Sequence, residues 1–334
     1  SVGGIVILAL LTSVASPFFS ALRAILHPHL HWILWAIIAY VLLSEWPKGS
    51  DRAPAGWPRW WEGWKSLVAG LTTFLLSGVL GFILLYRSPV PVTVAYQNLL
   101  PAFVGLFAVP WIVQNLLSRV ELPEQHVPRS LDATPRVILR GTLAGGLGGL
   151  FAAFLPVVTG GIGGLLAGHA SAQRDDRVFI ISQGASKVVY YVGALLLFFV
   201  PRLHLTRGGM AWMLSGLWTA HSPGTYYVAV AAVVLSGALS FFLLLLMARM
   251  AIWLIGRVSY RSISLATLVV LVLVVLWTTG WGGLLICTVA TGIGLIPVLW
   301  GSRRVNAMGV LLLPIALNMS GVGGVVAGWL GLVQ

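Results

Sequence analysis

Residues 138–168 read ILRGTLAGGLGGLFAAFLPVVTGGIGGLLAG, a segment of about 31 residues between two clear apolar runs. The segment is too long for one ordinary membrane crossing and too short for two comfortable ones. The stretch from Leu155 to Gly161, which contains Pro156, separates the two apolar arms. Small residues recur on the arms at every fourth position: Gly141, Gly145 and Gly149, then Gly160, Gly164 and Gly168. These features predict a re-entrant helical hairpin whose glycines allow close backbone packing.

The composition places this segment in a membrane protein. Of the 334 residues, 58% are hydrophobic and only 8% are charged, which excludes a water-soluble globular domain. The apolar runs are continuous rather than alternating, which favours helices over a β-barrel. Cys287 is the single cysteine, so neither a disulfide nor a cysteine-rich metal site is expected. We therefore expect an all-α polytopic membrane protein.

Apolar runs predict about nine transmembrane helices besides the hairpin. Their ranges are 2–26, 31–46, 66–86, 97–118, 178–200, 224–248, 262–279, 281–300 and 306–332.

The distribution of basic residues predicts the orientation. The chain has 20 Lys and Arg against 8 Asp and Glu, a formal net charge of +12. Arg and Lys concentrate in loops 47–65, 119–140 and 249–261, so these loops are predicted to be cytoplasmic. The chain must then cross the membrane an even number of times between residues 140 and 249. Helices 178–200 and 224–248 supply two crossings, so the hairpin must return to the cytoplasmic side. The basic loops also suit anionic membrane lipids, and no nucleic-acid partner is expected.

An internal repeat is visible between the two halves of the chain. Gly63-Trp64 and the following Leu67 and Gly78 resemble Gly280-Trp281, Leu284 and Gly292. A repeat with an odd number of crossings has inverted topology, the common plan of transporters. We therefore divide the chain into 1–137, the remainder of a first repeat with four helices, and 138–334, a second repeat, within one integral membrane unit. The first repeat is expected to be incomplete, with its own hairpin and following helix about 70 to 100 residues upstream of Ser1.

The helix after the hairpin carries the polar groups that the sequence places deepest in the membrane. Lys187 falls about ten residues into helix 178–200, roughly 15 Å along its axis. Gln183, Lys187 and Tyr191 share one face, and Ser182 and Ser186 lie beside it. We expect this stripe to point into the bundle, because a lone ammonium in lipid costs several kcal/mol. The partner of Lys187 is then an anionic substrate, hairpin carbonyls or a carboxylate of another segment.

Other chemistry has little support. No Asp or Glu follows Asp176, so residues 177–334 offer no carboxylate pair and no proton relay of acids. No nucleophile, base and orienting group can be assembled, so no enzymatic activity is expected. His27, His29 and His31 lie together at a predicted external interface, and we do not expect them to bind a metal. No cofactor is expected, and a coupling ion, if one is used, would be Na⁺ or H⁺.

The glycine hairpin, the polar helix after it, and the closing stretch Arg303-Arg304-Val305-Asn306-Ala307-Met308-Gly309-Val310-Leu311-Leu312-Leu313-Pro314 resemble an archaeal branch of the TctA family. This family comprises the large permease subunits of tripartite tricarboxylate transporters. The resemblance implies a secondary transporter with two inverted repeats, in which a Pro-Gly hairpin tip reaches a midplane site for carboxylates. It places the tip at Leu155 to Gly163 and the site-lining helix at Ser182 to Lys187. The usual Leu-Pro-Gly-x-Gly tip is here Leu-Pro-Val-Val-Thr-Gly-Gly-Ile-Gly.

The expected function is alternating-access transport of an organic, carboxylate-type anion across the cell membrane. Two alternatives remain: a flippase for polyprenyl-phosphate or another anionic lipid, and a non-transporting structural subunit of a membrane complex. A partner subunit or a homo-oligomer is compatible with each of them. The predicted substrate-binding residues are Thr159, Gly160, Gly161, Gly163, Ser182, Gln183, Ser186 and Lys187. The predicted hairpin-packing residues are Gly141, Gly145, Gly149, Pro156, Gly164 and Gly168.

Overall fold

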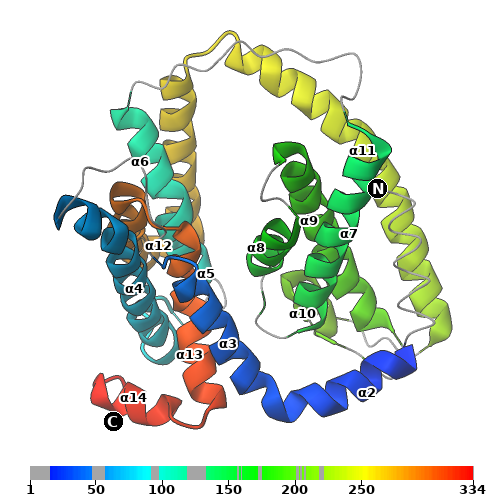
Figure 1. The fold of residues 1–334 in the computed structure, drawn as a ribbon, viewed down its shortest axis with the longest axis horizontal. Helices are drawn as coiled ribbons and strands as arrows, with labels where there is room; N and C mark the ends of the chain where they lie inside the picture. Colours follow the sequence, from blue (N-terminus) through cyan, green and yellow to red (C-terminus); the bar gives the residue numbers. More distant parts are fainter. Residues whose placement is uncertain are drawn as a thin grey trace. The chain divides into compact units, whose positions relative to one another are not determined.

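The regular elements of the chain are helices. The computed structural model describes residues 16–46, 57–91, 98–118, 133–155, 158, 160–171, 175–200, 203, 205–206, 208–217 and 222–333. Among these residues no strand occurs (Figure 1). Within the described ranges, seven helical stretches are long and apolar enough to cross a membrane, and an eighth candidate is a pair of helices bent by 117°. The prediction of an all-α polytopic membrane protein is confirmed.

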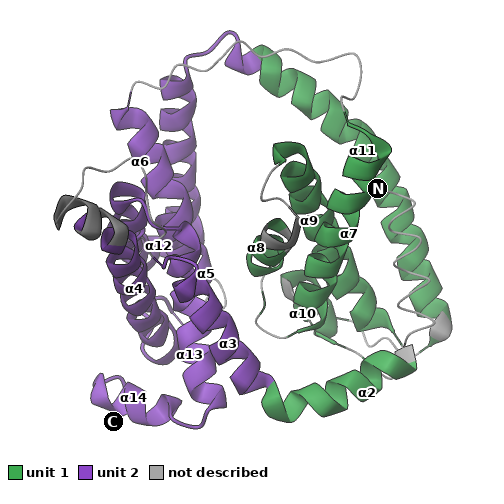
Figure 2. Ribbon diagram, in the orientation of Figure 1, with its two compact units in different colours: residues 1–29, 125–253 green, residues 30–124, 254–334 purple. Residues whose placement is uncertain are grey.

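The chain forms two compact units (Figure 2). Unit 1 comprises residues 1–29 and 125–253, and unit 2 comprises residues 30–124 and 254–334. Each unit therefore combines an earlier and a later part of the sequence. The division predicted at residues 137/138 separates sequence repeats rather than compact units, and it stays a prediction.

Unit 1 contains the hairpin and the helices around it. The two arms of the hairpin are α7 and α8, and α9 begins and ends within two residues of the predicted helix 178–200. Only 6% of the residues in the most apolar stretch of the long helix α11 are buried, which suits a helix surrounded by lipid. The elements of unit 1 are α2 (Ser16–Leu26), η1 (His27–His29), α7 (Pro135–Phe154), α8 (Gly160–Ser171), α9 (Asp176–Phe199), α10 (Gly208–Ser215) and most of α11 (Pro223–Ile255).

Unit 2 is built from helices of both sequence halves around a shared apolar core. Leu80, Leu106, Ile286 and Val310 meet there, and each is at most 6% exposed. The elements are α3 (Leu30–Leu43), α4 (Trp57–Tyr86), α5 (Leu99–Phe103), η3 (Val104–Ala108), α6 (Val109–Leu117), α12 (Tyr260–Trp300), η4 (Arg304–Met308), α13 (Gly309–Met319) and α14 (Gly323–Trp329).

One predicted helix boundary is confirmed and one predicted helix needs correction. Helix α2 ends at Leu26 and α3 begins at Leu30, as predicted to within one residue, and with the turn η1 between them residues 17–43 together qualify as one candidate span. The predicted helix 306–332 is divided into η4, α13 and α14. Gly321, with φ 78°, breaks the chain between α13 and α14, because a left-handed φ ends an α-helix and favours glycine.

Within α12 the chain reverses at Gly280, whose φ 66° and ψ −160° are not helical. The hydroxyl of Tyr260, before the break, accepts a hydrogen bond of 3.1 Å from Asn115 Nδ2 at the end of α6. Ala290, after the break, lies against Gly105 in η3, the element that precedes α6. The arms 260–279 and 281–300 therefore run in opposite directions along residues 104–115. This agrees with the two separate helices predicted from the sequence.

One kind of helix contact occurs twice in unit 2. A Cβ atom at Gly294 would lie 2.7 Å from the ring of Pro110, and one at Gly81 would lie 2.8 Å from the ring of Pro314. Each proline stands five residues after a glycine, Gly105 or Gly309, that packs on the backbone of the facing helix. In both places only glycine permits the helices to approach this closely.

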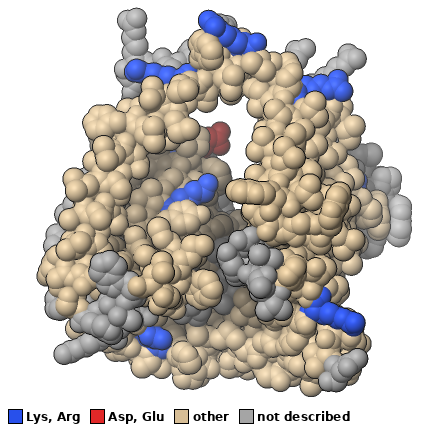
Figure 3. All heavy atoms as spheres, turned by 180° about the vertical axis from the view of Figure 1, so that it is seen from behind, with Lys and Arg blue, Asp and Glu red and all other residues tan. Residues whose placement is uncertain are grey.

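The unit surfaces are largely uncharged. On the face drawn in Figure 3, uncharged residues predominate, and Lys and Arg are scattered among them. Such a surface suits a protein whose helices contact lipid, because charged side chains are costly in the hydrocarbon region.

Candidate functional site

The first arm of the hairpin packs on α9 through glycines. A Cβ atom at Gly149 would lie 2.5 Å from the carbonyl oxygen of Ser186, and one at Gly145 would overlap the carbonyl oxygen of Ser182. The contacts recur at every fourth residue of α7, at Gly141, Gly145 and Gly149. Helices α7 and α9 therefore run in parallel at a separation that only glycine permits.

The second arm packs on another side of α9 and runs antiparallel to it. The three contacts are Gly160 with Tyr190, Gly164 with Gln183, and Gly168 with Phe179. At the middle contact Gln183 Nε2 donates a hydrogen bond of 2.7 Å to the carbonyl oxygen of Gly164. This bond ties α8 to α9 one turn from the hairpin tip.

The two glycine stripes thus contact α9 rather than each other. The arms themselves meet at Gly163, where a Cβ atom would lie 2.9 Å from Ala152 and would overlap the carbonyl oxygen of Gly148. A stripe of small residues indicates how closely a partner helix approaches, but the spacing does not identify the partner. The hairpin and α9 consequently form one three-helix packing unit.

The predicted residues at the hairpin tip have different environments. Gly160, at the start of α8, is half-buried, Gly161 is exposed, and Gly163 is buried between the arms. Thr159 and Pro156 lie outside the described residues. Gly160 and Gly161 are the first two residues of α8, a position at which backbone N–H groups have no partner within the helix.

The two serines lie on the side of α9 that faces α7, and both are 0% exposed. Ser182 Oγ donates a hydrogen bond of 2.8 Å to the carbonyl oxygen of Phe179 in its own helix. Ser186 Oγ is buried and has no hydrogen-bond partner among the described residues. An unmade hydrogen bond of this kind costs about 1–3 kcal/mol.

Lys187 lies beside the start of α8. It follows Gln183 by four residues and precedes Tyr190 by three, so the three side chains share one side of α9. Because Gln183 contacts Gly164 and Tyr190 contacts Gly160, Lys187 is level with the first turn of α8. Its side chain is exposed, whereas we expected a buried stripe. The ammonium is therefore not enclosed by the described helices of its unit.

The charges near the hairpin are separated by position along α9. Asp175 caps the start of α9, where its side chain accepts a hydrogen bond of 2.9 Å from the backbone N–H of Arg177. The first turn of α8, beside Lys187, contains no acidic residue. The positive end of the α8 dipole and the ammonium of Lys187 thus act on the same region, which can bind a carboxylate or a phosphate.

A buried carboxylate in unit 2 was not singled out by the sequence. Glu45 is 7% exposed, and its Oε1 accepts hydrogen bonds from the backbone N–H of Arg303 at 2.7 Å and from Asn306 Nδ2 at 3.1 Å. Gly70 leaves room for this cluster, because a Cβ atom there would lie 2.7 Å from Asn306 Nδ2. Glu45 therefore caps the start of η4. Its position as a lone acid at the end of an apolar run was the available signal.

The part of the chain that the structure describes contains no candidate metal site. There, no group of three or more His, Cys, Asp or Glu residues is placed to hold an ion.

The chain is similar to known proteins along most of its length. It is 26% identical over 262 residues to the "Uncharacterized protein MJ1079" of Methanocaldococcus jannaschii, an alignment that covers 76% of this chain and 61% of the relative. The chain thus spans less than two thirds of the length of the curated relative that it matches. No solved structure matches it. Residues 1–309 match a family of membrane transporter components, described as the tripartite tricarboxylate transporter TctA family, and the chain belongs to this family.

Proposed function

We propose that this chain forms part of a secondary transporter that carries an organic, carboxylate-type anion across the cell membrane by alternating access. The membership of the TctA family supports transport by a membrane protein, and the hairpin unit supports an anionic substrate. The observation that carries the proposal is the position of Lys187 level with the first turn of α8.

The anion is held at the broken end of the hairpin. Backbone N–H groups of Gly160 and Gly161 at the start of α8 bind the carboxylate, Gly163 lets the two arms approach closely behind them, and Lys187 supplies the opposing charge. Thr159 adds a hydroxyl donor next to the same turn. The amide of Gln183 holds the second arm of the hairpin through its bond to Gly164, and the backbone of Ser186 packs against Gly149 of the first arm.

The wider setting of the transporter follows the same proposal. The family description names a tripartite system, which supports a partner subunit for this chain, with a homo-oligomer as the alternative. Transport of an anion against its gradient is coupled to entry of Na⁺ or H⁺. The cytoplasmic basic loops contact anionic lipids of the plasma membrane.

Uptake by proteoliposomes tests the proposal. Radiolabelled citrate is offered to the full chain, with and without an imposed Na⁺ or proton gradient, and Lys187→Ala is compared with Lys65→Ala. The control removes the other described lysine, which lies on α4 in unit 2. We expect Lys187→Ala to reduce uptake at least about tenfold, the cost of one charged hydrogen bond, and Lys65→Ala to retain it.

Two results would refute the proposal. Equal uptake by both variants would remove the charge role of Lys187. Movement of a fluorescent polyprenyl-phosphate analogue between leaflets, without uptake of citrate, would instead favour a lipid flippase.

A further inference from the structure

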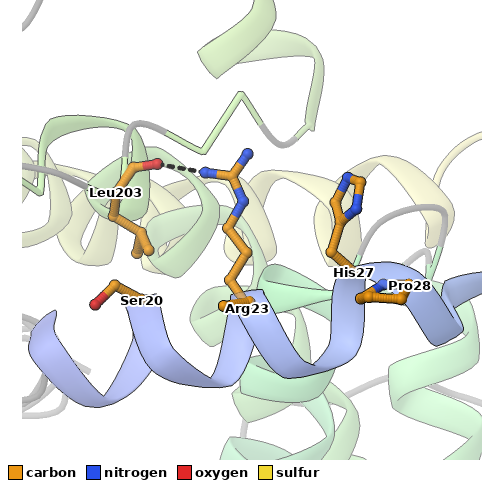
Figure 4. Close-up of a pocket in the computed structure, with 6 residues that line it drawn as sticks. Ser20, Arg23, His27, Pro28 and Leu203 are labelled. Carbon is orange, nitrogen blue, oxygen red and sulfur yellow. Dashed lines mark hydrogen bonds between the residues drawn. The ribbon is translucent and has the colours of Figure 1, made fainter.

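Unit 1 contains a pocket that the hairpin does not line. It is an open pocket of about 460 Å³ along α2 and the turn η1, with Leu203 as its lining residue from outside these elements (Figure 4). The volume falls within the range typical of small-molecule sites, about 300–1,000 Å³. The lining residues are Ser20, Arg23, Ala24, His27, Pro28 and Leu203, and none of them is acidic.

Arg23 is fixed at the wall of this pocket. Its Nη1 donates a hydrogen bond of 2.9 Å to the carbonyl oxygen of Leu203. A guanidinium carries five N–H donors in a planar fork, so this bond orients the group and leaves further donors for a ligand. The arrangement therefore presents a positioned cation rather than a freely moving side chain.

His27 adds a second nitrogen donor to the same space. It stands four residues after Arg23, and Figure 4 shows both side chains rising from the same side of α2 and η1. The hydroxyl of Ser20 is turned to its own helix, where Ser20 Oγ donates to the carbonyl oxygen of Pro17 at 2.8 Å. The polar groups left to meet a ligand are thus the guanidinium and the imidazole, which together suit an oxyanion.

The pocket lies near the end of α9 rather than near its start. Leu203 stands four residues after Phe199, the last residue of α9, whereas Arg177 is in its first turn. Phe19, one turn before Arg23, packs on Phe154 at the end of α7, with ring centroids 5.4 Å apart. Because the hairpin is predicted to return to the cytoplasmic side, the start of α9 is cytoplasmic and the pocket near its other end faces the outer side of the membrane.

We propose that Arg23 and His27 form a second anion site, for the carboxylate or phosphate group of a small solute or of a lipid headgroup on the outer side. The guanidinium binds two oxygens of the anion through its free N–H groups, and the imidazole donates to a third. This site is separate from the one at Lys187 and does not depend on the proposed transport activity.

Binding measurements on the full chain in nanodiscs test the site. Citrate binding is followed by isothermal titration calorimetry, and retained phosphatidylglycerol is counted by native mass spectrometry after detergent washing. The variants are Arg23→Gln, Arg23→Lys and His27→Gln. The controls are His29→Gln, in the same turn but outside the pocket lining, and Arg249→Gln on α11.

We expect Arg23→Gln to weaken binding of one of the two probes at least about tenfold, the loss of a charged hydrogen bond. Arg23→Lys keeps the charge without the fork and should bind at an intermediate level. His27→Gln should weaken the same probe, and the two controls should not. Loss of citrate binding identifies a free anion as the ligand, and loss of the retained lipid identifies a headgroup.

The proposal is overturned if Arg23→Gln and His27→Gln bind both probes as the wild type does. If Arg23→Gln does not fold, as judged by its melting temperature, His27→Gln decides alone. Lys187→Ala separates this site from the transport proposal. It should lose uptake while leaving the Arg23-dependent binding unchanged.

Discussion

The packing of the hairpin on α9 leads to a prediction with an internal control on the same helix. Gly145 and Gly146 are neighbours in α7, but a Cβ atom at Gly145 would lie 2.7 Å from the Cβ of Ala185 and would overlap the carbonyl oxygen of Ser182. A Cβ atom at Gly146 would meet no atom within 4 Å. Gly145→Ala and Gly146→Ala therefore make the same chemical change in two different surroundings.

The magnitude of the difference follows from two opposing effects. Replacing glycine by alanine inside a helix gains about 1 kcal/mol in helix propensity at either position. Overpacking a tight contact costs about 1–3 kcal/mol, and at Gly145 the obstructing atoms belong to the backbone and to a short side chain. Since the propensity gain is common to both variants, Gly145→Ala should be less stable than Gly146→Ala by about 1–3 kcal/mol.

Thermal unfolding of both variants in the same nanodiscs measures this difference. We expect Gly146→Ala to melt at or above the wild-type temperature and Gly145→Ala to melt several degrees below it. Equal melting temperatures would refute the packing of α7 on α9. A lower temperature for Gly146→Ala would place the other face of α7 against a partner.

Further predictions concern unit 2 and use thermal unfolding in nanodiscs as the measurement. Gly309→Ala should destabilise the protein by about 1–3 kcal/mol, because its Cβ would lie 2.6 Å from Ser77 Oγ. Gly292→Ala should not destabilise it, because a Cβ there would meet no atom within 4 Å. A stable Gly309→Ala would disprove the contact with Ser77. Gly280→Ala should cost about 1–3 kcal/mol because φ 66° with ψ −160° is a glycine conformation, and an unchanged melting temperature would contradict the chain reversal. Glu45→Ala should lower the free energy of unfolding by about 1–3 kcal/mol, because it removes the acceptor of two hydrogen bonds. Glu45→Gln keeps an acceptor oxygen and should lose less stability. Equal losses in the two variants would exclude the capping role of Glu45.

The sequence predicts the hairpin unit well because its signals are local. The glycine spacing and the interruption at Pro156 lie within one segment, and α9 begins at an aspartate cap that the sequence displays. Hydropathy likewise separates the two arms of α12, since Gly280 marks the point where the chain reverses. In each case the information needed is contained in a few neighbouring residues.

Contacts between distant segments could not be predicted in the same way. The spacing of Gly141, Gly145 and Gly149 is compatible with packing on either neighbour, and only the structure assigns the stripe to α9. The exposure of Lys187 depends on which side of α9 the hairpin covers, which the helical period alone does not fix. The capping contact of Glu45 joins residues far apart in the chain, so no local pattern announces it.

The internal repeat shows why the alignment of two apolar helices is hard to fix from the sequence. The sequence comparison aligned Gly63-Trp64 with Gly280-Trp281. The paired contacts with Pro314 and Pro110 indicate a correspondence of Gly81 with Gly294, which is one turn from the pairing of Gly63 with Gly280 but within one residue of the predicted pairing of Gly78 with Gly292. Successive turns of an apolar helix resemble each other closely, so similarity of composition leaves such slips undetected.

A structure of the full chain in nanodiscs with citrate, determined by electron cryomicroscopy, tests the central claim most directly. The claim is that an anion binds between the first turn of α8 and Lys187. We predict density for a compact anion in contact with the backbone N–H groups of Gly160 and Gly161 and with the ammonium of Lys187. Citrate bound elsewhere, with Lys187 satisfied by protein groups alone, would contradict the account.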